Sequence, residues 1–86
     1  MDHQFYIERK RKLIADNVAE PVRDAAIIQL MILKNGPRDL RKVEAIIKEL
    51  KRKKDRAYDM RDTLYYLTEL EGYEWLRDMI EDNSLK

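Results

Sequence analysis

A stretch of 34 residues between Pro37 and Gly72 contains neither glycine nor proline, and it constrains the fold more than any other feature of the sequence. Strong helix formers fill it, so the sequence predicts one long helix over about residues 38–71. Such a helix would be about 50 Å long, whereas a compact chain of 86 residues has a radius of gyration of only about 12 Å. Either the helix breaks, or a second chain covers its overhanging part.

An apolar seam runs along this stretch with alternating spacings of three and four residues, as in a coiled coil. Its positions are Val43, Ile46, Leu50, Lys53, Ala57, Met60, Leu64, Leu67 and Glu71. The polar positions are Lys53, inside a basic block, and the terminal Glu71, so any break is expected near residues 52–56. We predict that the helix is continuous and that a second copy covers it.

The segment from Pro21 to Lys34 is predicted to be the central buried helix. Pro21 suits the first turn of a helix, and Asn35-Gly36-Pro37 predicts a left-handed cap followed by a helix-ending proline. Apolar residues lie on all sides of this helix, as in one surrounded by others. They are Val22, Ala25, Ala26, Ile27, Ile28, Leu30, Met31, Ile32 and Leu33. Two or three other helices cannot surround it, so a symmetric partner is expected to supply the missing wall.

Two shorter helices complete the predicted fold, one over about residues 2–16 and one after Gly72 that ends near Asp82. Residues 83–86 are expected to fray. The predicted fold class is therefore all-α: a small bundle of three to four helices in a single domain over 1–86, completed as a homodimer.

The composition argues against an enzyme, a cofactor site or a metal site. The sequence has no cysteine and only two glycines, which excludes a cysteine nucleophile and a glycine-rich phosphate loop. The single histidine, His3, is expected to be mobile and solvated. Asp55, Asp59 and Asp62 share a helix side without the histidine that a di-metal bundle site usually needs. We predict a non-enzymatic protein without cofactor or metal.

The sequence also predicts a cytoplasmic protein without a membrane segment. No apolar signal region is visible in the first twenty residues. The longest apolar stretch, from Ala25 to Leu33, is interrupted by Gln29 and is about half the length needed to cross a bilayer. The lack of cysteine fits a reducing compartment.

Tyrosine and tryptophan cluster in the C-terminal third of the chain, and both are favoured anchors at protein interfaces. Tyr65 and Tyr66 are consecutive and point about 100° apart on a helix, so at least one is expected at the rim of the core or at a contact. The leading prediction is a small regulator or adaptor that binds an unidentified protein partner through the long helix and this third. The expected interface residues are Ile27, Met31, Leu50, Ala57, Tyr58, Met60, Leu64, Tyr65, Tyr66 and Trp75. The alternative for the aromatic residues is the edge of a single bundle core.

Two basic blocks leave nucleic-acid binding open as the alternative function, because dense Lys and Arg neutralise phosphates and release counterions. The residues are Arg9, Lys10, Arg11 and Lys12 in one block, and Lys51, Arg52, Lys54 and Arg56 in the other. A solvated helix face explains the same residues. The chain end is acidic, although the net charge is only +1. Segregated charge of both signs also suits contact with a second copy or packing of one helix against another.

Overall fold

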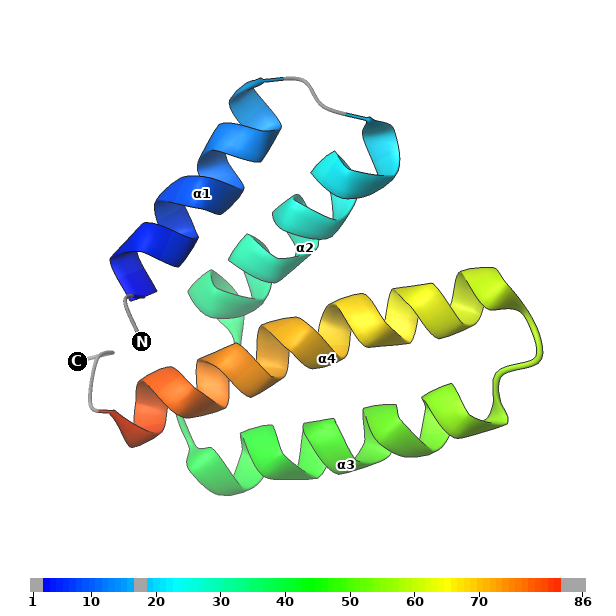
Figure 1. The fold of residues 1–86 in the computed structure, drawn as a ribbon. Coiled ribbons are helices and arrows are strands. Elements are labelled where there is room, and N and C mark those ends of the chain that lie inside the picture. The colour runs from blue at the N-terminus through cyan, green and yellow to red at the C-terminus, as the bar shows by residue number, and fades with distance from the viewer. Residues whose placement is uncertain (1–2, 17–18, 83–86) are drawn as a thin grey trace.

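The computed structural model describes residues 3–16 and 19–82, and the regular elements in this part of the chain are all helices (Figure 1). They are α1 (His3–Ala15), α2 (Glu20–Asn35), α3 (Leu40–Arg56) and α4 (Met60–Glu81). The Cα radius of gyration is 13.3 Å. The predicted all-α fold with up to four helices is confirmed. The predicted fraying of residues 83–86 lies outside the described residues.

The four helices form two antiparallel hairpins that meet at α4 (Figure 1). One hairpin pairs α1 with α2 and the other pairs α3 with α4, and α2 also packs across α4. The central helix is therefore α4, and the prediction that residues 21–34 are buried on all sides is wrong. Three apolar residues of α2, Val22, Ile27 and Met31, are exposed, and Met31 is 55% exposed.

The predicted helix over 38–71 is also wrong, because the chain folds back at residues 57–59 between α3 and α4. Ala57 is extended, and the Asp59 side chain caps the next helix by accepting a hydrogen bond from the Arg61 amide at 2.9 Å. The break lies just beyond the predicted window of 52–56. The described residues also contain no separate helix after Gly72, because α4 continues through this residue to Glu81.

Folding back at 57–59 buries the apolar stripe of α3 within one chain. Val43, Ile47 and Leu50, spaced by four and three residues, are buried, and Val43 is 0% exposed. They belong to one core cluster with Ile32, Leu33, Leu70, Trp75, Leu76 and Met79. Because this core closes without a second chain, the seam and α2 do not require a dimer.

The connection between α2 and α3 ends α2 in a way that the sequence did not predict. Gly36 has φ −65° and ψ 158°, so the predicted left-handed cap is wrong. Glycine is needed here for space, since a Cβ would lie 2.5 Å from the Ile32 carbonyl oxygen and 2.6 Å from Leu76 Cδ2. The Arg38 guanidinium donates to the Leu33 carbonyl at 2.7 Å and satisfies a carbonyl at the helix end.

The crossing of α2 and α4 is centred on Gly72. A Cβ at this position would lie 2.9 Å from Ile32 Cδ1 and 3.5 Å from Gln29 Cα, so the missing side chain lets the helices approach closely. Gln29 is 1% exposed, and its amide group donates to the Thr68 carbonyl at 3.2 Å and to Glu71 Oε2 at 3.0 Å. Glycine inside a helix costs about 1 kcal/mol relative to alanine, and here the close contact offsets that cost.

Replacing Gly72 by leucine is expected to lower the free energy of unfolding by about 1–3 kcal/mol, because the added atoms overlap Ile32 and Gln29. Urea unfolding followed by circular dichroism measures the change. Ala45→Leu, at an exposed position of α3, is the matched control. Its free energy of unfolding should stay within about 0.5 kcal/mol of the wild-type value. A Gly72→Leu variant as stable as the wild type would contradict the close crossing.

Candidate functional site

A groove runs along α4 where α1 and α3 leave one side of the helix uncovered, and we call it the α4 groove. Its lining comes from three helices: Tyr6 of α1; Lys51 and Lys54 of α3; and Leu67, Leu70, Glu71, Glu74, Trp75 and Asp78 of α4. The lining has an apolar part between charged residues of both signs. Such a surface suits an elongated ligand that has both apolar and charged groups.

An exposed apolar stripe extends the groove along the N-terminal half of α4. Met60, Leu64 and Leu67 are 71%, 56% and 43% exposed. They are spaced by four and three residues, so they lie on one face of the helix, and Leu67 also lines the groove. No helix in the described part of the chain covers these three side chains, although their pattern is that of a helix face that packs against another helix.

Charge changes sign along the α4 groove. The α3–α4 hairpin turns at 57–59, which places Lys51 and Lys54 beside the N-terminal half of α4, near Leu67. Glu74 and Asp78 lie seven and eleven residues beyond Leu67, about 10–16 Å farther along the helix. The groove therefore has a basic end and an acidic end, and a ligand that follows it meets the two in turn.

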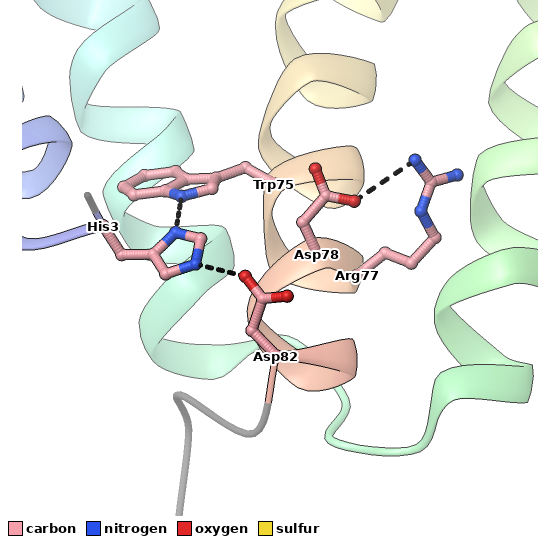
Figure 2. A network of polar contacts seen from close by, with 5 residues as sticks. All are labelled: His3, Trp75, Arg77, Asp78 and Asp82. Carbon is pink, nitrogen blue, oxygen red and sulfur yellow. Dashed lines mark hydrogen bonds and ion pairs between the residues drawn. The ribbon is translucent and has the colours of Figure 1, made fainter. Parts of the chain in front are cut away.

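Beside the acidic end of the groove, the start of α1 contacts the end of α4 (Figure 2). The Trp75 indole N–H donates to His3 Nδ1 at 2.9 Å, and His3 Nε2 lies 2.9 Å from Asp82 Oδ2. An accepting Nδ1 assigns the proton of a neutral imidazole to Nε2, which then donates to Asp82. The His3 side chain is only 10% exposed, so the prediction of a mobile, solvated histidine is wrong.

Glu71 joins α1 and α2 to α4 beside the groove. The Tyr6 hydroxyl donates to Glu71 Oε1, Gln29 donates to Oε2, and Lys10 Nζ lies 3.9 Å from Oε1. The Tyr6 ring packs on Trp75 with a centroid separation of 3.7 Å. Burial, followed by the hydrogen bond and the charge of Glu71, raises the pKa of Tyr6, so its hydroxyl stays a hydrogen-bond donor to a higher pH than in the unfolded chain. The carboxylate thus fixes the position of α1, which forms one wall of the groove.

The predicted interface residues do not form one surface. Six of them are exposed: Ile27, Met31, Tyr58, Met60, Leu64 and Tyr65. Met60 and Leu64 belong to the exposed stripe of α4, and Leu64 also lines, with Tyr65, a hollow between α2 and α4. Ile27 and Met31 lie on α2. Ala57 and Tyr66 are half-buried, and of the two consecutive tyrosines it is Tyr66 that packs against the core.

Leu50 and Trp75 lie in the core, with 6% and 4% exposure, and are too covered to be the surface anchors that the sequence predicted. The fold-back of α3 and the packing of α1 cover them. Sequence reasoning missed Leu67 and Tyr6 as groove residues. Leu67 follows Leu64 by three residues in the apolar seam, so its spacing could have identified it, whereas Tyr6 lines the groove only through the packing of α1.

The two basic blocks lie on different helices and have different surroundings. On α1 are Arg9, Lys10, Arg11 and Lys12, and on α3 are Lys51, Arg52, Lys54 and Arg56. Lys10 is held against the Tyr6 ring, with Nζ 4.9 Å from its centroid. Arg52 donates to Glu49 at 2.6 Å, and this hydrogen bond lowers the pKa of Glu49. In each block, at least one basic side chain therefore interacts with a residue of its own chain.

Among the described residues, no three His, Asp or Glu side chains are grouped so that they could share a metal ion. No helix in the described ranges has the length and apolarity to cross a membrane. Comparison with known proteins gave no match to a protein-family model, to a curated protein or to a solved structure.

Replacing Tyr6 by phenylalanine removes the hydrogen bond to Glu71 and is expected to lower the free energy of unfolding by about 1–2 kcal/mol at pH 7. The pKa of Tyr6 is raised in the fold, so its stabilising contribution is complete below the unfolded value of about 10 and is lost as pH rises above it. The difference between wild type and variant should therefore shrink at about pH 10.5. Urea unfolding at both pH values measures it, and a difference that stays constant would count against the Glu71 contact.

Proposed function

We propose that the protein is a small, non-enzymatic interaction module that binds a helical segment of another polypeptide in the α4 groove. The observation that carries the proposal is the exposed stripe of Met60, Leu64 and Leu67 beside an apolar groove floor. Grooves of this kind bind the apolar face of an amphipathic helix, whose anchors repeat every three or four residues. The sequence predicted partner binding through one long helix over about residues 38–71, and we now propose α4 as the part of that stretch that binds.

The charges along the groove define the helix that would fit it. Acidic side chains on the bound helix would pair with Lys51 and Lys54, and basic ones with Glu74 and Asp78. Between these ends, the helix needs an apolar stripe against Leu67. A regulator or an adaptor needs only such a binding surface and no catalytic site. The lack of cysteine supports the proposal that the protein acts in the cytoplasm.

A designed amphipathic helix tests the proposal. The probe is a peptide of about 18 residues, about 27 Å long, with a leucine stripe, an acidic end and a basic end. Its addition should shift the amide NMR signals of Leu64 and Leu67 and change the fluorescence of Trp75, the single tryptophan of the chain.

The variant Leu67→Glu should weaken this binding by about ten-fold or more, because it places a charge in the apolar stripe. Met31→Glu is the matched control, since Met31 is 55% exposed and lies outside the α4 groove, and it should bind as the wild type does. Absence of shifts at millimolar peptide, or equal loss in both variants, would contradict the proposal.

The outer face of α3 favours nucleic-acid binding as a second candidate function. The helix has eight Lys or Arg residues against three acidic ones. Arg41, Lys48, Arg52 and Arg56, spaced by seven, four and four residues, lie on one side of it. A short DNA duplex at about 50 mM salt should then shift the signals of these residues and lose affinity steeply as salt rises. No shift under these conditions would exclude this candidate.

A further inference from the structure

We propose that the helix bound in the α4 groove runs parallel to α4 and antiparallel to α1 and α3, with acidic side chains at its N-terminal end and basic ones at its C-terminal end. The inference rests on the proposed function, because it fixes the direction and the charge order of the same partner. It is carried by the directions of the two helices that wall the groove, together with the order of charges along it.

Both wall helices run antiparallel to α4, which forms the floor of the groove (Figure 1). At the start of α1, His3 contacts Asp82 at the end of α4. Farther along α1, Lys10 lies near Glu71, which is farther back along α4. The fold-back at 57–59 makes α3 antiparallel to α4 as well. The N-terminal ends of α1 and α3 are therefore on the side of the acidic end of the groove, and their C-terminal ends are on the side of the basic end.

Helix dipoles favour one direction for a helix packed between these walls. A helix has a partial positive charge at its N-terminus and a partial negative charge at its C-terminus. When the bound helix is antiparallel to both walls, each of its ends lies beside wall ends of opposite partial charge, and in the reverse direction each lies beside ends of like partial charge. The favoured arrangement is that of an up-and-down four-helix bundle, with α4 and the bound helix as diagonal partners.

The charges of the groove define the side chains of a helix bound in this direction. Its N-terminal end lies beside Lys51 and Lys54 and needs acidic side chains, because the unpaired amide groups of a helix N-terminus would be repelled by the lysines. Its C-terminal end lies beside Glu74 and Asp78 and needs basic side chains. This order of charges also stabilises the bound helix through its own dipole, whereas a helix bound in reverse would need the order that destabilises it.

One helix satisfies the apolar stripe and the charges together. Met60, the first residue of the stripe, and Asp78, the last acidic residue of the groove, are 18 residues apart on α4, about 27 Å. Apolar side chains in the N-terminal half of the bound helix face the stripe, and the basic side chains follow them opposite the acidic end. The acidic side chains lie beside the apolar ones, toward α3, because the lysines of the groove belong to that wall.

A spin label tests the direction of binding. The forward peptide is the designed helix of about 18 residues with its acidic side chains in the N-terminal half and its basic ones in the C-terminal half. A nitroxide at its N-terminus should broaden the amide NMR signals of Lys54 and Leu64 more strongly than those of Glu74 and Asp78, and a nitroxide at its C-terminus should do the opposite. A diamagnetic label is the control. An N-terminal nitroxide that mainly broadens Glu74 and Asp78 would overturn the inference and leave the proposed function standing.

A peptide with the same residues in reverse order is the second probe. It should bind about three- to thirty-fold more weakly than the forward peptide, because its charges oppose its own dipole at both ends. Equal or tighter binding would overturn the inference. Absence of binding by both peptides at millimolar concentration would overturn the inference and the proposed function together.

A charge change in the groove tests which end of the peptide meets the lysines. The variant Lys51→Glu with Lys54→Glu should bind the forward peptide at least about ten-fold more weakly, and it should prefer a peptide with lysine in place of the N-terminal acidic residues. The matched control, Lys42→Glu with Lys48→Glu, has the same change in net charge at exposed sites outside the groove and should bind as the wild type does. Circular dichroism confirms that both variants are folded. Equal weakening in the control, or no change of preference, would overturn the inference.

Discussion

The close crossing of α2 and α4 at Gly72 determines how the remaining helices are placed. Because Gly72 has no side chain, Ile32 and Gln29 approach the α4 backbone, and the buried Gln29 amide binds the Thr68 carbonyl and Glu71. The Gln29 amide oxygen has no hydrogen-bond partner within the described chain, so the buried amide is only partly satisfied. A buried polar contact of this kind favours one register of the two helices over its neighbours.

The crossing divides α4 into two halves with different surroundings. The C-terminal half contacts α1, α2 and α3, and supplies Trp75, Leu76 and Met79 to the core (Figure 1). The N-terminal half extends past α2 and has α3 as its main neighbour, which leaves Met60 and Leu64 exposed. The groove and its apolar stripe are thus a consequence of where α2 crosses. The same geometry gives the groove opposite charges at its ends, because α3 adds lysines beside one half while the other half carries its own carboxylates.

The sequence predicted the helical class and the apolar positions of the long stretch, but not how that stretch is arranged. The seam from Val43 to Leu67 serves equally for a continuous helix paired with a second chain and for a hairpin folded on itself. Two features favour the hairpin over the continuous helix. The Asp59 side chain caps α4, and the α1–α2 hairpin, which is distant in sequence, packs against α4. Met60 and Leu64, which were predicted to lie at an interface, are exposed in the single chain. The burial of Trp75 depends on α1 and could not be read from helical spacing.

The most direct test of this account is a nuclear Overhauser spectrum of the isotopically labelled protein. The fold-back at 57–59 predicts that sequential amide–amide contacts are interrupted there, and the crossing predicts contacts from the Gly72 α-protons to the Ile32 δ-methyl group. Unbroken amide contacts from residue 40 to residue 81, without a Gly72–Ile32 contact, would show one continuous helix. That result would contradict the crossing and the groove together.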